Sequence, residues 1–118
     1  MVENGQTLRI MTASPERFPI SDAREAHIAL ASGIRLRTLH RGPDDGDGPV
    51  FLLIHGLASN ARMWDGVGSE LAAQGHRSIA VDLRGHGRSD KPDEGYDFDT
   101  VNRDLCELLD ALSIDKAV

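Results

Sequence analysis

The sequence has little cysteine, few aromatic residues and no excess of positive charge. Cys106 is the only cysteine among the 118 residues, so an internal disulfide and a thiolate metal cluster are excluded. One tryptophan, one tyrosine and three phenylalanines offer no row of platforms on which nucleic-acid bases could stack. The formal net charge is −6, which disfavours a phosphate backbone as a partner. We therefore expect no nucleic-acid partner.

Long apolar runs are also missing. Charged residues and two prolines, Pro15 and Pro19, interrupt residues 1–20, so this stretch does not have the pattern of a signal peptide. The longest apolar run, Val50–Ile54, has the length of a buried strand and is too short to cross a bilayer. We therefore expect no membrane partner and, by default, a cytoplasmic location.

The composition is that of one globular domain. Apolar residues make up 40% of the sequence and charged residues 27%, which are ordinary values for a protein with a hydrophobic core. Residues 1–26 show no clear period and are expected to form an irregular lead-in. Residues 27–118 are expected to form the folded part, because periodic apolar patterns begin there.

A β-hairpin is predicted at the start of this part. His27–Ala31 and Ile34–Leu39 have strand character and flank a short turn that contains Gly33. The second of these segments alternates apolar and charged residues with a period of two, as a half-buried strand does. Glycine, proline and aspartate dominate residues 42–49, which predicts a loop.

Strands and helices alternate after this loop. Val50–Ile54 and Ser78–Val81 predict strands of a parallel sheet, the first of them buried on both sides. Between them, Met63, Val67 and Leu71 recur at helical spacing and predict a helix.

A second helix is predicted near the end of the sequence. Gly75 is the expected end of the first helix, and Asp97 is the expected N-cap of the second. One apolar stripe runs along this second helix, formed by Val101, Leu105, Leu108, Leu109 and Leu112. The alternation of strands and helices indicates an α/β sheet with helices on both faces.

The segments that follow the two buried strands carry the informative motifs. His55 and Gly56 directly follow the first strand, with Trp64 further along. The second strand is followed by D-L-R-G-H-G-R-S-D-K-P over residues 82–92, and G-Y-D-F-D-T over residues 95–100 leads into the last helix. In this order and spacing, the segments resemble the N-terminal part of the α/β-hydrolase family, and look closest to its esterase and cofactor-free haloperoxidase branch.

This resemblance extends over Ile34–Val118 and implies hydrolysis of an ester or related acyl small molecule without a cofactor or metal. In the family, the residue after His-Gly donates its backbone N–H to the oxyanion hole, which assigns this role to Leu57. Gly56 is expected to let the chain turn sharply without a Cβ clash. His55 is expected to support the oxyanion loop as part of the scaffold, because the family's general base lies near the C-terminus.

Other residues that could suggest chemistry have a simpler interpretation. Asp82 and Arg84 are expected to brace the loop after the second buried strand by hydrogen bonds. His86 is expected to be solvated in that loop. Trp64 and Cys106 are expected to be packing residues on the first and second helix.

The nucleophile of the family is absent from this sequence. No serine has glycine both two positions before and two positions after it, as the G-x-S-x-G elbow requires. Ser89 comes nearest, with Gly87 before it and Lys91 after it. Leu112–Val118 reads as the end of the last helix followed by the first residues of the next strand. We therefore expect the N-terminal half of an α/β-hydrolase sheet, truncated before the nucleophile elbow and inactive by itself.

Several alternatives stay open. Epoxide or haloalkane hydrolases of the same fold often carry an aromatic residue and a proline after His-Gly, whereas this sequence has Leu57 and Ala58. Haloperoxidase activity is not separated from esterase activity by these residues. An inert fragment, or a split half that pairs with another chain, is a further alternative. In that case the exposed apolar edge of Val50–Ile54 is the expected site of self-association or of a partner chain.

Overall fold

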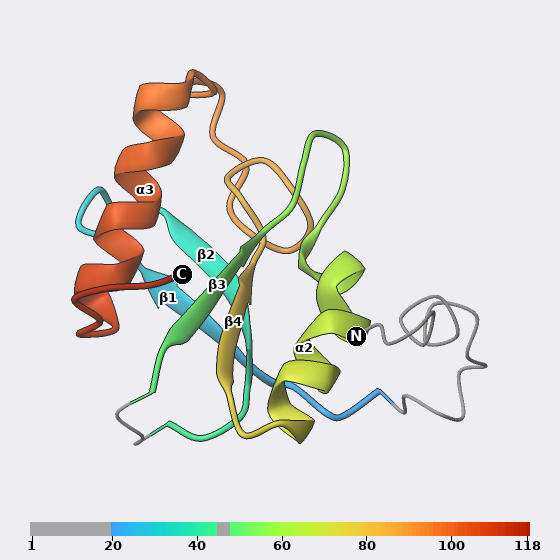
Figure 1. The fold of residues 1–118 in the computed structure, drawn as a ribbon. Helices are drawn as coiled ribbons and strands as arrows, with labels where there is room; N and C mark the ends of the chain where they lie inside the picture. Colours follow the sequence, from blue (N-terminus) through green and yellow to red (C-terminus); the bar gives the residue numbers. More distant parts are fainter. Residues whose placement is uncertain (1–19, 45–47) are drawn as a thin grey trace.

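The computed structural model describes residues 20–44 and 48–118 of the chain (Figure 1). Residues 1–19, which make up most of the predicted lead-in, lie outside the described residues. The strands are β1 (Arg24–Ala29), β2 (Arg35–Arg41), β3 (Val50–Ile54) and β4 (Arg77–Val81). The helices are the 3₁₀ helix η2 (Ala61–Trp64) and the α-helices α2 (Asp65–Ala73) and α3 (Phe98–Ala111).

The strands form one mixed sheet in the order β1-β2-β4-β3. β1 and β2 are the antiparallel hairpin that the sequence predicts, with Gly33 at a φ of 96° in its turn. β1 begins at Arg24, earlier than the predicted start at His27, because residues 24–26 also pair with β2. β2 is antiparallel to β4, and β3 is parallel to β4. The predicted parallel pair is therefore confirmed.

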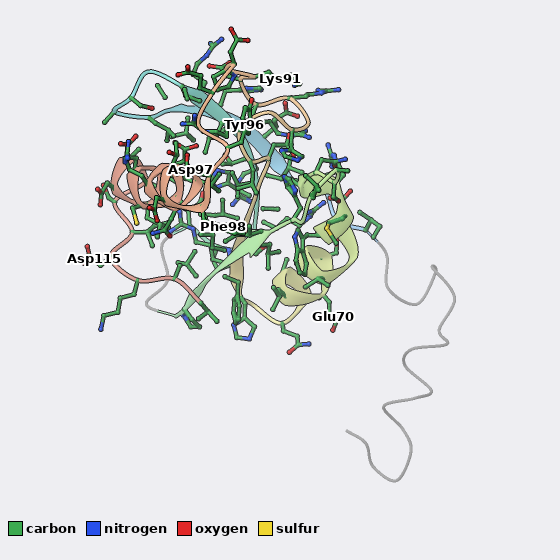
Figure 2. The ribbon with its side chains drawn as sticks, turned by 90° about the horizontal axis from the view of Figure 1, so that it is seen from above. Glu70, Lys91, Tyr96, Asp97, Phe98 and Asp115 are labelled. Atoms are coloured by element: carbon green, nitrogen blue, oxygen red, sulfur yellow. The ribbon has the colours of Figure 1, made fainter. Side chains whose placement is uncertain are left out.

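The two α-helices cover opposite faces of the sheet (Figures 1 and 2). Leu108 of α3 is fully buried in a cluster with Leu36 and Val81. On the other face, the cluster around Leu39 and Ala80 packs against η2 and α2. Neighbouring strand residues point to opposite faces, so Ala80 and Val81 serve different clusters. Within the described residues, none of the helices combines the length and the apolar character needed to cross a membrane.

The helix between β3 and β4 forms, but its predicted apolar face is confirmed only at Leu71. Met63 is 57% exposed and Val67 is 47% exposed, whereas Leu71 packs against the core. The buried side of α2 includes Gly68, because the side chain of Arg41 occupies the space between helix and sheet. A Cβ at Gly68 would lie 3.1 Å from Nη1 of Arg41. A larger residue at this position would therefore crowd the buried Arg41 of β2.

Both predicted helix boundaries are confirmed. Gly75 adopts a φ of 86° just beyond the end of α2, and its N–H donates to the carbonyl of Ala72 at 2.9 Å. At the start of α3, the Asp97 carboxylate accepts the N–H of Thr100 at 3.0 Å. The carboxylate also meets the positive end of the helix dipole, and hydrogen bonding to Thr100 lowers the pKa of Asp97.

β3 is the edge strand of the described sheet. Leu53 is 9% exposed but Ile54 is 41% exposed, so the expectation of a strand buried on both sides is not met. Val118 lies against the free edge: its N–H donates to Val50 at 2.8 Å and its carbonyl accepts the N–H of Leu52 at 3.0 Å. This pair of bonds follows the parallel pattern. The end of the sequence therefore approaches β3 as the start of a next strand would.

Candidate functional site

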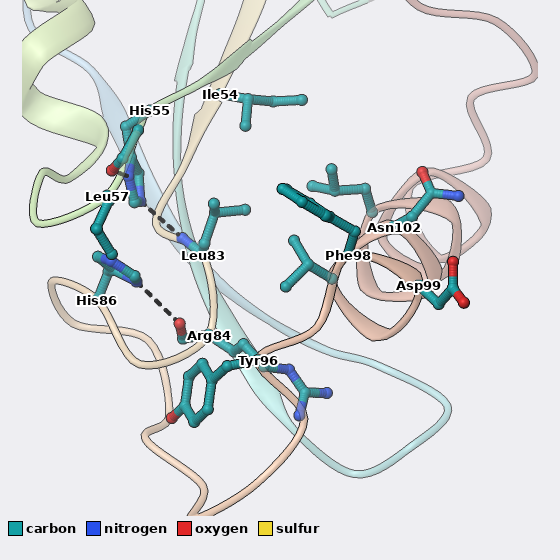
Figure 3. Close-up of a pocket in the computed structure, with 13 residues that line it drawn as sticks. Ile54, His55, Leu57, Leu83, Arg84, His86, Tyr96, Phe98, Asp99 and Asn102 are labelled. Atoms are coloured by element: carbon teal, nitrogen blue, oxygen red, sulfur yellow. Dashed lines mark hydrogen bonds between the residues drawn. The ribbon is translucent and has the colours of Figure 1, made fainter.

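A cleft of about 640 Å³ opens at the carboxyl ends of β3 and β4, beside the start of α3 (Figure 3). It brings together the segments that follow the two strands and the segment that leads into the last helix. Its lining residues are Ile54, His55, Gly56, Leu57, Leu83, Arg84, His86, Tyr96, Phe98, Asp99, Val101, Asn102 and Leu105. Backbone groups at such strand ends leave the sheet ladder and become available to a ligand.

His55 connects the ends of β3 and β4. Its Nδ1 contacts the carbonyl of Gly56 at 2.7 Å, and its Nε2 accepts the N–H of Leu83 at 3.0 Å. A carbonyl can only accept and an N–H can only donate, so the ring is neutral with its proton on Nδ1. The residue is 4% exposed. Both ring nitrogens are therefore occupied by the backbone, and neither is free to act as a general base.

The hydrogen bond from His55 orients the peptide group between Gly56 and Leu57. Because the peptide is planar and trans, its N–H points away from the carbonyl that His55 holds. Within residues 20–44 and 48–118, the Leu57 N–H donates to no acceptor. The Leu57 side chain is 92% exposed and lies beside His55 at the cleft (Figure 3). This peptide N–H is therefore both held in orientation and unengaged.

The predicted steric reason for glycine at position 56 is wrong. A Cβ at Gly56 would meet no atom within 4 Å, and its φ is not positive. The positive φ, 61°, falls instead at Ala58. The Ser59 N–H closes the turn onto the Gly56 carbonyl at 3.3 Å, and Ala58 is the third residue of that turn. This is the arrangement of a type II turn, whose third residue requires positive φ.

Asp82 braces the loop after β4, as predicted. The residue is fully buried, and its carboxylate accepts Nε of Arg37 at 2.7 Å. It also accepts the backbone N–H groups of Ala61 at 2.7 Å and Arg88 at 2.8 Å. Burial alone would raise the pKa of the Asp82 carboxyl, but these hydrogen bonds outweigh burial and lower it. The charged carboxylate thus joins β2, η2 and the loop.

Arg84 is also confirmed as a bracing residue, and its partner was missed. Its guanidinium contacts Asp104 of α3 twice, Nε to Oδ2 at 2.6 Å and Nη2 to Oδ1 at 2.8 Å. Hydrogen bonding to Asp104 raises the pKa of Arg84, although burial opposes it. Asp104 is only 2% exposed. Its position between Val101 and Leu108, on the inward side of the helix, was the signal in the sequence.

His86 is not the solvated side chain that the sequence predicts. Its ring is half-buried at the cleft, with centroids of His86 and His55 4.8 Å apart. Nδ1 contacts the Arg84 carbonyl at 3.0 Å, and Nε2 accepts the Ala58 N–H at 3.4 Å. The loop can fold back in this way because Gly85 adopts a positive φ of 78°.

The two predicted packing residues differ in outcome. Trp64 packs against the cluster that contains Leu39 and Leu53, so its prediction is confirmed. Cys106 is exposed on α3, so its prediction is wrong: the side chain follows Leu105 on the helix and points away from the sheet. Within the described part of the chain, no three histidine, cysteine or acidic residues are grouped so that they could hold a metal ion.

Curated proteins similar to this chain include a member of the AB hydrolase superfamily and a chloroperoxidase. The AB hydrolase superfamily protein YisY of Bacillus subtilis (strain 168) is 40% identical over 75 residues, which are 64% of this chain and 28% of that protein. A non-heme chloroperoxidase of Streptomyces lividans is 44% identical over 77 residues, which are 65% of this chain and 27% of that protein.

Solved structures of the same fold resemble the described one. The esterase EaEST from Exiguobacterium antarcticum superposes with a TM-score of 0.72 and 28% identity. The superposition covers 80% of this chain and 34% of the esterase chain. The epoxide hydrolase VrEH1 from Vigna radiata superposes with a TM-score of 0.73 and 26% identity. The superposition covers 81% of this chain and 30% of the epoxide hydrolase chain.

The match to a family model decides which family the chain belongs to. The chain spans only 27% to 34% of the length of these relatives. The parallel pair of strands, the helices on both faces (Figure 1) and the cleft at the strand ends agree with the fold that the resemblance implies. A family model described as the alpha/beta hydrolase fold matches residues 49–118, more than half of the chain, and the chain therefore belongs to the α/β-hydrolase fold family.

Proposed function

We propose that this chain carries the oxyanion-binding side of a site that hydrolyses an ester or related acyl small molecule. The nucleophile is supplied by residues outside these 118, because no serine here stands in the G-x-S-x-G pattern. The similarity to a solved esterase supports the choice of reaction.

The observation that carries the proposal is the orientation of the Gly56–Leu57 peptide. Nδ1 of His55 holds its carbonyl at 2.7 Å, so the opposite N–H is directed away from His55 and has no acceptor in the described residues. A donor that is held in place before reaction stabilises the negative charge that develops on a carbonyl oxygen. Such a donor contributes about 3 kcal/mol to the transition state.

The test compares two variants that both lose the leucine side chain but differ in whether the backbone N–H of residue 57 is present. Leu57→Pro lacks the N–H, whereas the matched control Leu57→Ala keeps it. In the protein purified from its natural source, with its full mass, L57P is expected to lower kcat on p-nitrophenyl esters by roughly 10²–10³-fold. L57A is expected to keep kcat within about threefold, since the side chain is 92% exposed.

A thermal melt of both variants accompanies this assay. If L57P hydrolyses the ester as fast as L57A while both remain folded, Leu57 is not an oxyanion donor. The 118-residue chain by itself is expected to show no saturable ester hydrolysis, because an oxyanion donor without a nucleophile does not complete a catalytic cycle. Turnover by this chain would contradict the proposal that the nucleophile lies outside these 118 residues.

A second candidate is cofactor-free haloperoxidase activity. It is favoured by the relative named as a non-heme chloroperoxidase, which is 44% identical over 77 residues. Peroxide-dependent halogenation by the protein from its source, without ester hydrolysis, would replace the leading proposal. Epoxide hydrolysis is less favoured, since Leu57 and Ala58 stand where that branch often has an aromatic residue and a proline.

We further propose that the 118-residue chain associates with itself or with a partner chain along β3. Within the described residues, Val118 pairs with this edge at Val50 and Leu52 alone, and Ile54 at the other end of the strand stays 41% exposed. Unpaired backbone groups on an apolar edge favour the addition of a further strand. Size-exclusion chromatography at increasing concentration tests this, and a stable monomer that unfolds cooperatively would contradict it.

A further inference from the structure

Two imidazole rings, His55 after β3 and His86 in the loop after β4, lie beside the turn after β3 (Figure 3). His55 contacts the Gly56 carbonyl at 2.7 Å, and Nε2 of His86 accepts the Ala58 N–H at 3.4 Å. Leu57 lies between these two points. The peptide group before Leu57 is held at its carbonyl, and the peptide group after Leu57 is held at its N–H. The ring centroids are 4.8 Å apart and tilted by 54°.

The orientation of His86 is itself set by the buried framework. Its Nδ1 contacts the Arg84 carbonyl at 3.0 Å. Arg84 is in turn immobilised by the two contacts with Asp104 of α3. Since the Arg84 carbonyl accepts and the Ala58 N–H donates, His86 carries its proton on Nδ1 and presents a lone pair on Nε2. A connected set of contacts therefore runs from α3 to the turn after β3.

Ala58 needs such a contact because its backbone is strained. Its φ of 61° lies in the left-handed region, which residues with a Cβ rarely adopt unless their surroundings hold them there. Within the described residues, Nε2 of His86 is the acceptor of the Ala58 N–H. Loss of this acceptor would allow the turn to relax and to rotate the neighbouring Leu57 N–H.

We propose that His86 is a positioning residue that acts through Ala58 to hold the Leu57 N–H in its binding orientation. This inference rests on the proposed oxyanion role of Leu57. His86 touches no reacting atom in this proposal. It sets the geometry of the donor, so its loss affects the transition state more than substrate binding.

Two substitutions of similar polarity separate positioning from a general structural role. In His86→Asn, the amide nitrogen can replace Nδ1 at the Arg84 carbonyl, but the side chain is too short to reach Ala58. In His86→Gln, the longer side chain places an acceptor where Nε2 was. In the protein from its natural source, H86N is expected to lower kcat on a p-nitrophenyl ester about tenfold at nearly constant KM, whereas H86Q stays within about threefold.

Amide hydrogen exchange at Ala58 provides a readout that does not depend on activity. Exchange is expected to be faster in H86N than in the unsubstituted protein, and to return toward the original rate in H86Q. If H86N unfolds, H86L replaces it, since leucine keeps bulk without an acceptor.

Equal losses of kcat in H86N and H86Q, or a change in KM alone, would overturn the positioning role. Unchanged Ala58 exchange in H86N would overturn it whatever the activity. If the unsubstituted protein hydrolyses no ester, the proposed function fails, and the exchange rates alone then decide the role of His86.

Discussion

The turns after β3 and β4 leave neighbouring strand ends and are built in opposite ways. In the turn after β4, Asp82 is fully buried and Ser89 is 3% exposed, and both are engaged in hydrogen bonds to β2. In the turn after β3, Leu57 is 92% exposed and its N–H meets no acceptor in the described residues. The turn after β4 is thus part of the buried framework, whereas the turn after β3 is held by that framework and exposed to the cleft.

The difference lies in where each turn finds its partners. Asp82 receives donors from Arg37 of β2, from Ala61 of η2 and from Arg88 of its own loop. Within the described residues, the side chains of His55 and His86 are the ones that contact the backbone of Gly56 and Ala58 in the turn after β3. We therefore expect substitutions that disturb the buried Asp82 in the β4 turn to reduce stability. Loss of the Leu57 N–H, or of the side chains that orient it, is expected to reduce activity while the fold persists.

The largest expected effect follows from Asp82→Ala. The substitution leaves the guanidinium of Arg37, which is 4% exposed, without its main carboxylate partner. Removing one member of a buried ion pair costs about 3–5 kcal/mol of unfolding free energy. Urea denaturation measures this loss. The exposed carboxylate of Asp115 provides a control, because D115N is expected to change stability by less than about 0.5 kcal/mol.

A loss in D82A no greater than that in D115N would contradict the assignment of Asp82 to the framework. In that case the contact of 3.6 Å between Arg37 and Glu25 would compensate the buried charge of the arginine by itself.

An intermediate effect separates two glycines, one in each turn. Gly87 has a φ of 53°, and a Cβ there would overlap the Asp82 carboxylate. G87A is therefore expected to cost about 1–3 kcal/mol, through overpacking and backbone strain. At Gly56 a Cβ would meet nothing within 4 Å. G56A is expected to stay within about 0.5 kcal/mol of the unsubstituted protein in the same urea titration.

Equal destabilisation by G56A and G87A would remove the contrast between the two turns.

The smallest expected effect is the response of β2 to mild acid. Burial, aided by the charges of Arg77 and Arg24, lowers the pKa of His40 below its ordinary value of 6.5. The folded state then binds fewer protons than the unfolded state between the two pKa values. Stability is accordingly expected to fall as the pH drops below about 6.5 and to level off beneath the folded pKa.

Urea denaturation of the unsubstituted protein and of His40→Gln between about pH 7.5 and pH 5 checks this response. The decline should be absent in H40Q. A decline of the same size in H40Q would assign the titration to another group. Asp82 has a lowered pKa as well, so its own loss of stability is expected only in stronger acid, below its ordinary value of 3.8.

Local patterns were sufficient for much of this fold. The alternation over Ile34–Leu39 predicted the second strand of the hairpin, and the side-chain chemistry of Asp97 predicted the start of α3. Gly75 marked the end of α2 because few other residues adopt positive φ without strain. Each of these signals acts within a few residues along the chain, which is why the sequence displays it directly.

Signals that depend on distant partners were harder to interpret. Met63 and Val67 have helical spacing, yet the face of α2 toward the sheet was decided by the bulk of Arg41. The inward carboxylate of Asp104 made sense only with Arg84, twenty residues away in the sequence, as its partner. A polar residue on a buried face indicates that a partner exists, but it does not indicate which one.

By itself, the sequence determined the order of the strands and α-helices along the chain, the end of α2 at Gly75, the N-cap of α3 at Asp97 and the place of Leu57 in the turn that follows a strand. Only the tertiary structure decided the strand order β1-β2-β4-β3, the bond of Arg84 to Asp104 and the meeting of His55 with His86. The physical reason is the range of the forces. Backbone propensities and capping bonds act between near neighbours in the chain, whereas packing and buried charge pairs act between any residues that the fold brings together.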